Sequence, residues 1–312
     1  MNTTLLRYMV EFAIQGTSQK AADSLGVSRS SITRGIRKLE DELGTQLFVN
    51  TPDGAVPTYA GDLCLRYARQ ILKIDSNLRF DLANDGLQSG TIHIGMGINR
   101  SQRVLPFVLP SFHKAYPNIQ VQLHEAFASE LEAELTSLQL DFAILQYPLS
   151  SPELDFKPLL AEKFVLVAPK GDIFAKQFSY FRDKTPFVTL EKFRGKPFVL
   201  PNTGRRSRII CDEVFQRAGI MPEVVFETKS SLNSAMLAYN GLGYTLVPES
   251  YTIVGCEEQI EYFYLEPDLE AQWMVGIATR SGDTLSHAAE LLKTEIVKIM
   301  EEISHSELIK NC

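Results

Sequence analysis

The chain has 312 residues, of which 45% are hydrophobic and 22% are charged. This composition is typical of a soluble globular protein and excludes collagenous and disordered chains. The length predicts about two domains. No run of about 18 apolar residues occurs, so the sequence predicts no membrane-spanning helix. The first residues do not resemble a signal peptide, and we therefore expect a cytoplasmic protein.

The net charge of −7 by itself disfavours a nucleic-acid partner. The acidic excess, however, lies entirely after residue 89, where 28 acidic residues outnumber 21 basic ones. Between Ser18 and Lys38 the balance is reversed, with five basic residues against Asp23 alone. A local basic patch in an acidic chain indicates a surface for nucleic acid near the N-terminus.

The first 44 residues predict three short helices. Apolar residues at helical spacing, from Leu5 to Ala13, define the first. The second begins near Ser18, which we expect to cap it, and Ser28 is placed to cap a third that runs to about Leu43. A glycine follows each of the three helices, at positions 16, 26 and 44. A helix, a short glycine-containing turn and a second helix form the helix-turn-helix pattern.

A hairpin and a long helix follow. Phe48 and Val49 favour a strand, Asp53-Gly54 favours a tight turn, and residues 55–58 favour a return strand. From Tyr59 to Leu87 the apolar spacing predicts one helix of about 28 residues, roughly 42 Å long. A helix of this length with an apolar stripe needs a partner, most simply its own copy in a dimer.

From residue 91 onward, strands alternate with helices, which predicts α/β architecture. The strands that we expect are 91–95, 119–124, 141–145, 164–168, 197–200, 224–227, 245–247, 260–265 and 273–278. The helices that we expect between them include 101–116, 129–138, 205–218, 231–240 and 285–303.

Several motifs together carry a family resemblance. The strongest are AADSLGVS at 21–28, IRKLEDELGTQLF at 36–48 and TYAG at 58–61, and further marks lie at 90–95, 140–144 and 241–248. With these motifs along essentially its whole length, the chain resembles the LysR-type transcriptional regulators of bacteria. The resemblance implies an α + α/β fold, with a winged helix-turn-helix at 1–58, a linker (dimerisation) helix at 59–89 and an effector-binding domain at 90–312.

The implied effector-binding domain resembles a type 2 periplasmic binding protein, with a ligand cleft between two α/β subdomains. We place subdomain I at about 90–161 and 267–312, and subdomain II at about 162–266. The resemblance implies a regulator rather than an enzyme, without cofactor or membrane contact. Its partners would be double-stranded DNA with interrupted dyad symmetry, a small effector, further copies forming a homodimer and then a tetramer, and RNA polymerase.

Within the resemblance, the third helix enters the major groove with its N-terminal end. Arg29 and Arg34 suit bidentate contacts to guanine, and Ser18 and Gln19 offer backbone N–H groups to phosphate. The residues that we predict to bind DNA are Ser18, Gln19, Arg29, Ser30, Ser31, Thr33, Arg34, Arg37, Lys38, Asn50 and Thr51.

Two positions depart from the family pattern. Gly35 stands where the family often has Gln, so we expect one base-reading side chain to be missing. Asn50 stands where the family usually has Arg, and no Lys or Arg occurs between Leu43 and Leu65. We therefore expect a wing that neutralises little phosphate charge, and affinity that depends on dimerisation.

Helix N-termini at the implied cleft suit an anionic ligand, because their N–H groups are unpaired. The arginines at positions 100, 103, 205 and 206 make a carboxylate the leading candidate. The residues that we predict to bind the effector are Asn99, Arg100, Ser101, Ser129, Gln146, Asn202, Thr203 and Thr228.

Other chemistry has weaker support. The five histidines show no paired spacing for a metal, and no nucleophile-elbow or phosphate-loop motif occurs. Redox sensing remains an alternative, because Arg205, Arg206 and Arg208 precede Cys211 and would lower the pKa of its thiol. A ligand-independent regulator, and a solute-binding protein or α/β enzyme that uses the same cleft fold, also remain open.

Overall fold

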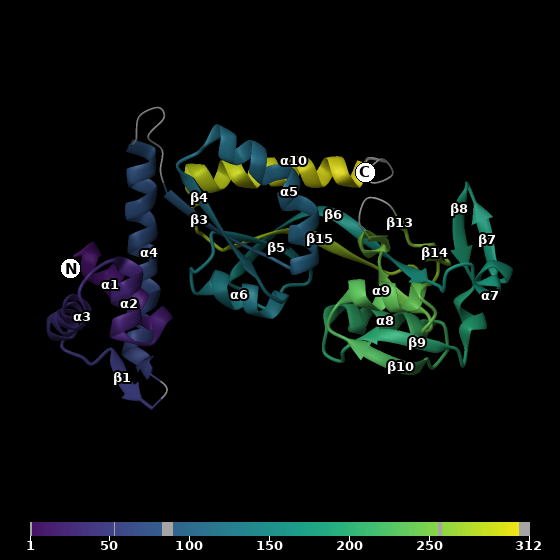
Figure 1. Ribbon diagram of the computed structural model, residues 1–312, viewed down its shortest axis with the longest axis horizontal. Helices are drawn as coiled ribbons and strands as arrows, with labels where there is room; N and C mark the ends of the chain where they lie inside the picture. The colour runs from purple at the N-terminus through teal and green to yellow at the C-terminus, as the bar shows by residue number, and fades with distance from the viewer. Residues whose placement is uncertain (1, 53, 83–89, 255–257, 306–312) are drawn as a thin grey trace.

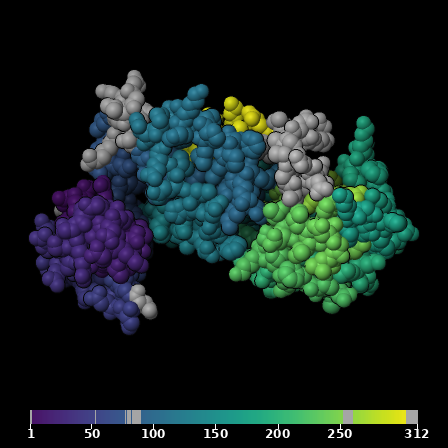
Figure 2. All heavy atoms as spheres, viewed as in Figure 1, coloured from purple at the N-terminus to yellow at the C-terminus, as the bar shows by residue number. Residues whose placement is uncertain are grey.

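The computed structural model describes residues 2–52, 54–82, 90–254 and 258–305. A small helical head is followed by a long helix and then by a larger α/β body (Figure 1). Figure 2 shows the head and the two halves of the body as distinct masses, and the halves of the body meet at a junction. The predicted α + α/β fold class is confirmed.

Three helices form the head, namely α1 (Thr3–Gln15), α2 (Ser18–Leu25) and α3 (Arg29–Leu43). They end at Gly16, Gly26 and Gly44, whose φ angles lie between 63° and 69°. This left-handed backbone is least costly for glycine, which explains why the helices end where the sequence predicts. Leu6 and Ile32 belong to the apolar core that joins the helices.

The N-cap of α2 differs from the prediction by one residue. Thr17, not Ser18, has the extended backbone of a cap, and its Oγ1 accepts a hydrogen bond from the N–H of Lys20. Either hydroxyl could serve as the acceptor, so the sequence alone does not decide between them. Ser28 caps α3 as predicted, by accepting a hydrogen bond from the N–H of Ser31 at 3.1 Å.

The wing is an antiparallel hairpin of β1 (Phe48–Thr51) and β2 (Gly54–Pro57), as predicted; Asp53 of its turn lies outside the described residues. It is attached to the turn after α1, where the N–H of Ala55 donates to the carbonyl of Gly16 at 2.8 Å. A Cβ on Gly54, whose φ is 127°, would lie 2.9 Å from that oxygen. The wing and the helices therefore form one packed unit.

The linker helix α4 covers Tyr59–Leu82, or 24 residues, which is roughly 36 Å. We predicted a helix to Leu87, and the last part of that prediction falls outside the described residues. A Cβ on Gly61 would lie 2.0 Å from the carbonyl oxygen of Leu47. The glycine of the TYAG motif is therefore required where α4 passes over the strand that begins the wing.

Subdomain I of the body is a sheet covered by helices on both faces. Its elements are β3 (Gly90–Met96), α5 (Ile98–Ala115), β4 (Ile119–Glu125), α6 (Ala128–Thr136), β5 (Phe142–Gln146), β6 (Leu154–Val167), β15 (Gln272–Arg280) and α10 (His287–His305). Helices α5 and α10 lie on one side of the strands and α6 on the other (Figure 1).

Strand β6 joins the two halves of the body. The strand order is β4-β3-β5-β15-β6-β14-β8-β7, and β11 also pairs with β6. Residues 154–163 of β6 pair with β15, whereas residues 164–167 pair with β11 (Thr245–Pro248) and β14 (Tyr262–Leu265). The chain therefore passes between the subdomains along a continuous strand, which we had expected to begin only at residue 164.

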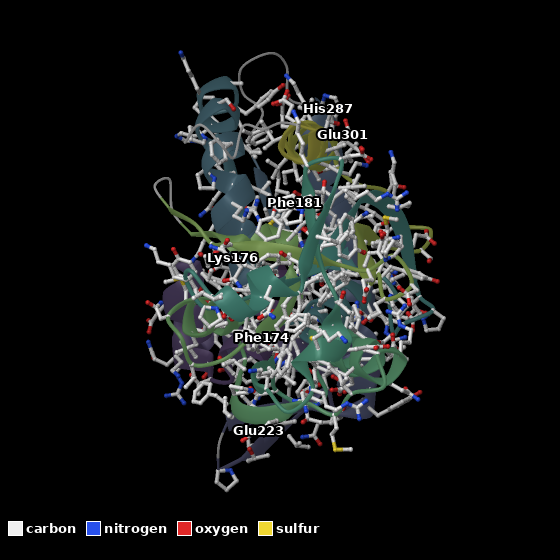
Figure 3. The ribbon with its side chains drawn as sticks, turned by 90° about the vertical axis from the view of Figure 1, so that its right-hand side faces the viewer. Phe174, Lys176, Phe181, Glu223, His287 and Glu301 are labelled. Atoms are coloured by element: carbon white, nitrogen blue, oxygen red, sulfur yellow. The ribbon has the colours of Figure 1, made fainter. Side chains whose placement is uncertain are left out.

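Subdomain II surrounds the second end of β6. Its other elements are α7 (Ile173–Gln177), β7 (Ser179–Arg182), β8 (Thr185–Val188), β9 (Pro197–Pro201), α8 (Arg206–Arg217), β10 (Glu223–Thr228), α9 (Ser231–Tyr239), β12 (Ile253–Val254), β13 (Glu258–Gln259) and the 3₁₀ turns 190–193 (η1) and 249–252 (η2). The β7–β8 hairpin, which carries the exposed Phe181 (Figure 3), was not among the strands predicted from the sequence.

No helix within the described ranges combines the length and the apolar character needed to cross a membrane.

Candidate DNA-binding and effector-binding sites

Helix α3 separates an apolar face from a polar one. Ile32 and Leu39 are fully buried, whereas Arg29, Arg34 and Lys38 are exposed. The remaining predicted contacts on this helix are exposed at Ser30 and Arg37 and half-buried at Ser31 and Thr33. A surface helix with clustered positive charge is suited to lie against a phosphate backbone and to present side chains to bases.

Serine residues hold the two arginines near the start of α3. The Nε of Arg29 donates to the Oγ of Ser18 at 3.1 Å, so the first residues of α2 and α3 are in contact. The Nε of Arg34 donates to the carbonyl of Ser30 at 3.2 Å. Ser18 thus contacts the helix that the sequence predicted to read bases, and Gln19 bonds to Asp23 one turn along α2.

Gly35 faces helix α1 rather than solvent, which corrects one interpretation of the sequence. The residue is buried, and a Cβ added to it would lie 2.7 Å from Cδ2 of Tyr8. A larger residue here would displace the Tyr8 ring. The glycine therefore allows α1 and α3 to approach closely, and a side chain at this position would not point to the exposed face where bases would be read.

The wing exposes little that would bind phosphate. Asn50 and Thr51 are exposed on β1, but the Thr51 hydroxyl donates to the carbonyl of Gly54 at 2.7 Å. Val49 and Val56 form a cross-strand pair and are 41% and 46% exposed. The exposed wing surface is thus apolar and neutral in the residues that the structure describes.

Helix α4 presents an apolar stripe to solvent and a polar contact to the body. The exposed apolar side chains on it are Tyr59, Leu63, Tyr67, Ile74, Leu78 and Leu82. Lys73 lies between two carboxylates of the body, with Nζ 3.3 Å from Asp141 Oδ1 and 2.7 Å from Asp283 Oδ2. Arg69 donates to the carbonyl of Ser137. No sequence signal links residues so distant in the chain.

Arg100, predicted to bind the effector, has another partner. Its Nη1 and Nη2 donate to the two oxygens of Glu162 at 3.0 and 2.9 Å, and Nε1 of Trp273 donates to the same carboxylate at 2.7 Å. All three residues are buried. Burial would raise the pKa of Glu162, but the Arg100 charge and the hydrogen bonds hold it below its ordinary value.

The other predicted contacts at the start of α5 are also engaged within the protein. The Ser101 hydroxyl lies 2.7 Å from the carbonyl of Ile98 and within hydrogen-bond distance of Glu125. Asn99 makes a side-chain hydrogen bond to Tyr251, in the turn after β11. Arg100 and Ser101, which the sequence predicted as direct effector contacts, therefore have partners within the protein that lie 62 and 24 residues away in sequence.

The subdomains meet again where α6 and α8 begin. Arg206, in the first turn of α8, pairs with the buried Glu132 of α6 and also donates to the backbone carbonyl of Gln146. The Arg205 guanidinium lies over the Phe127 ring, 3.3 Å from its centroid. Glu132, which no sequence motif singled out, also accepts hydrogen bonds through its Oε2 from the N–H groups of Ser150 and Ser151.

Both of these helix starts lack a side-chain cap, because Phe127 and Arg205 occupy the cap positions and neither residue can accept the hydrogen bond. Ser129 and Thr203 are exposed beside them. Where β9 and β10 end, the N–H of Asn202 donates to the carbonyl of Thr228, and the buried Oδ1 of Asn202 has no partner in the described residues.

Cys211 is not placed for redox chemistry. Its side chain is completely buried, and its Sγ contacts the carbonyl of Leu246 at 3.4 Å. Burial is the main reason that its pKa is raised far above the ordinary value. The nearby Asp212 raises the pKa further, whereas Arg208 lowers it. Cys256 and Cys312 lie outside the described residues. Within those residues, no group of three or more acidic, histidine or cysteine side chains could hold a metal.

Two family descriptions match the chain and together cover most of it. "Bacterial regulatory helix-turn-helix protein, lysR family" matches residues 3–62, and "LysR substrate binding domain" matches residues 85–300. A helix-turn-helix head joined to a substrate-binding body defines a class of DNA-binding regulators with an effector domain. The chain belongs to the LysR family of transcriptional regulators, as its motifs indicated, and it is not an enzyme.

Relatives agree with this assignment. The transcriptional regulator CzcR of Bacillus anthracis is 30% identical over 248 residues, which cover 78% of this chain and 79% of that protein. A cysteine-to-aspartate variant of full-length OxyR from Pseudomonas aeruginosa is similar in structure, with a TM-score of 0.72, 24% identity, and coverage of 95% of this chain and 94% of that one. Full-length CbnR complexed with its target DNA gives a TM-score of 0.59 at 20% identity, and the match covers 96% of this chain and 100% of that one.

Proposed function

We propose that this chain binds an operator of interrupted dyad symmetry as a dimer, with one head on each half-site. The observation that supports the proposal is α3, whose exposed face carries Arg29, Arg34, Arg37 and Lys38. A sequence-specific regulator must place such a face in the major groove. The predicted DNA-binding residues remain our proposed contacts, and such a protein acts on chromosomal DNA in the cytoplasm.

Selection of genomic fragments by the purified full-length chain, followed by footprinting, tests this proposal. We expect one enriched motif with two related half-sites and protection of both. Enrichment of no sequence over random fragments would contradict it. A variant with both Arg34 and Lys38 replaced by Ala serves as the control that retains the fold but loses binding, because both side chains are exposed.

The dimer is proposed from the exposed stripe on α4. Ile74 and Leu82 are 67% and 71% exposed on a helix that otherwise packs against head and body. Burying such side chains against a second copy removes apolar surface from water. Ile74→Glu should therefore convert the dimer to monomer in analytical ultracentrifugation, while Ser76→Glu, on the same helix, should leave the dimer unchanged.

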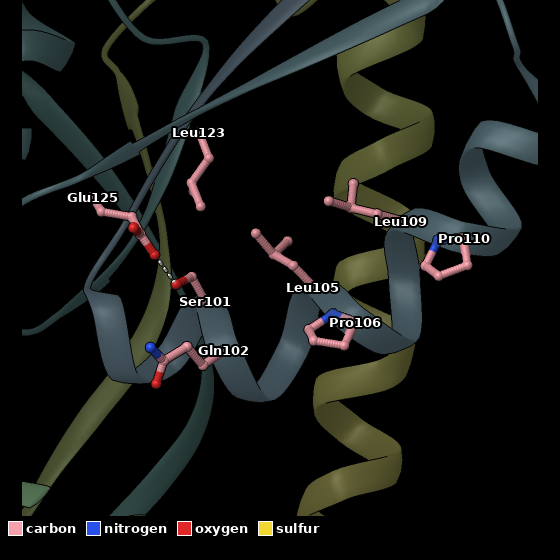
Figure 4. Close-up of a pocket in the computed structure, with 8 residues that line it drawn as sticks. All are labelled: Ser101, Gln102, Leu105, Pro106, Leu109, Pro110, Leu123 and Glu125. Carbon is pink, nitrogen blue, oxygen red and sulfur yellow. Dashed lines mark hydrogen bonds between the residues drawn. The ribbon is translucent and has the colours of Figure 1, made fainter.

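A tetramer through the effector domains is proposed from two further apolar surfaces. A groove of about 560 Å³ beside α5 is lined by Leu105, Pro106, Leu109 and Leu123 (Figure 4). Strand β10 exposes Val224, Val225 and Phe226 on subdomain II. Ultracentrifugation of Phe226→Glu should show dimers where the wild type forms tetramers. RNA polymerase is a further partner that we propose for the DNA-bound assembly.

The effector is proposed to be a small anion, such as a carboxylate, bound near the starts of α6 and α8. These two helix N-termini lack side-chain caps, and Arg205 adds a positive charge beside them, whereas the charge of Arg206 is paired with Glu132. Asn99, Ser129, Gln146, Asn202, Thr203 and Thr228 remain proposed contacts. Thermal unfolding of the full-length chain with acetate, succinate and citrate tests the proposal, with Arg205→Ala as the variant expected to lose stabilisation.

A further inference from the structure

The contact between Ser18 and Arg29 joins the first residues of two helices that both face outward from the head. Ser18 is the first residue of α2, because Thr17 takes the cap position, and its hydroxyl is therefore not needed to cap the helix. Arg29 is the first residue of α3. The hydrogen bond joins Arg29 Nε to Ser18 Oγ at 3.1 Å, across 11 residues of sequence and the intervening turn.

This contact uses Nε of the Arg29 guanidinium and leaves the two outer nitrogens, Nη1 and Nη2, available as donors. Nη1 and Nη2 of Arg29 have no protein partner among the described residues, and the side chain is exposed. A guanidinium is a rigid planar fork, so holding Nε restricts the positions that both outer nitrogens can take. Two parallel N–H donors in one plane match the O6 and N7 acceptors of a guanine in the major groove.

Arg34, the second arginine on this face, is anchored differently. Its Nε donates to the backbone carbonyl of Ser30, and its Nη2 approaches the Ser30 hydroxyl at 3.5 Å. The main anchor of Arg34 is therefore backbone, which no substitution removes, whereas Arg29 depends on one side chain of another helix. The two arginines give an internal comparison.

We propose that Ser18 is a positioning residue for sequence reading: it orients Arg29 so that Nη1 and Nη2 bind one guanine in each half-site. A long side chain free in solution must lose rotamer freedom on binding, and prior fixation lowers that cost. Ser18 therefore sets specificity through Arg29, whereas a contact of its backbone N–H to phosphate carries no sequence information.

Selection of genomic fragments by full-length variants tests this role of Ser18, which rests on the proposed function and uses the same assay. Ser18→Ala should lower affinity for the wild-type motif about three- to tenfold and flatten the preference at one base pair of each half-site. Arg29→Lys should flatten the preference at the same position, since a Lys lacks the fork. Ser24→Ala, exposed on the same helix, is the matched control and should leave the motif unchanged.

The salt dependence separates reading of a base from contact to phosphate. If Arg29 contacts only phosphate, Arg29→Lys keeps the motif, and Arg29→Ala weakens all sequences alike while lowering the slope of log K against log salt by about one. That result overturns the proposal, as does an unchanged motif for Ser18→Ala. Absence of any motif for the wild type would instead contradict the proposed function itself.

Discussion

The buried ion pair of Arg100 and Glu162 should be the most sensitive polar contact of the body. In Glu162→Gln, the buried Arg100 guanidinium loses its counter-charge. The amide also offers one acceptor oxygen in place of two, so the N–H groups of Arg100 and Trp273 compete for it. Removing one member of a buried pair costs about 3–5 kcal/mol. For a domain of 150–250 residues this lowers the midpoint of thermal unfolding by about 10 °C.

The chain supplies its own probe, because Trp273 is its single tryptophan and bonds directly to Glu162. Urea and thermal unfolding followed by tryptophan fluorescence should show the shift. The double variant Arg100→Met/Glu162→Met should recover most of the loss, because it leaves no unpaired buried charge. A Glu162→Gln variant within about 1 kcal/mol of wild type would refute this reasoning.

The pH dependence follows from the direction of the pKa shift. The pKa of Glu162 is lower in the folded chain than in the unfolded one, so the unfolded state takes up the proton first. The stabilisation by this group is complete above the unfolded pKa, near pH 4.5, and falls as pH drops through the folded value. The difference between wild type and Glu162→Gln should therefore be constant from about pH 6 to 8 and shrink below about pH 4.5.

Four further predictions concern other parts of the chain. Lys73→Met should leave Asp141 and Asp283 without their shared cation. Fluorescence energy transfer between one label on α4 and one on the body should then show a broader distance distribution, whereas Lys298→Met should leave the distribution unchanged. Gly61→Ala should destabilise the head by about 2 kcal/mol or more in thermal unfolding, since its Cβ would overlap the Leu47 carbonyl; an unchanged midpoint would contradict that. Peroxide should leave Cys211 unmodified in mass spectrometry of the native protein, because burial raises its pKa, and modification that tracks loss of DNA binding would restore the redox alternative. The slope of log K against log salt should be no steeper than about −4 to −5 per head, given five basic residues between Ser18 and Lys38 and a wing without Lys or Arg, and a steeper slope would show wing contacts that we do not expect.

The head was predictable because its determinants are local. Helical apolar spacing, Ser28 as a cap and glycines at the helix ends all act within a few residues of sequence. The choice between Thr17 and Ser18 as cap was not predictable, since both carry the same acceptor. The role of Gly35 was also hidden, because its neighbour Tyr8 comes from another helix.

The candidate effector site was harder to predict, because its partners are distant in sequence. Arg100 looks like an anion-binding residue until Glu162, 62 residues later, is placed beside it. The first half of β6 was missed for a related reason. Pro158, Lys157 and Glu162 interrupt its apolar pattern, and only pairing with β15 explains why the segment is a strand. Glu132 carried no motif at all.

The bond between the wing and the turn after α1 has an evolutionary consequence. Because Ala55 and Gly16 fasten the wing to the helices, the head presents α3 and the wing in one fixed relation. In the proposed dimer, the bases that are read and the distance between the two half-sites are therefore separable properties. Substitutions on the exposed face of α3 would change the base sequence that is read, whereas substitutions around Lys73 would change the distance between the two half-sites. A lineage of regulators built on this chain could alter either property while keeping the other.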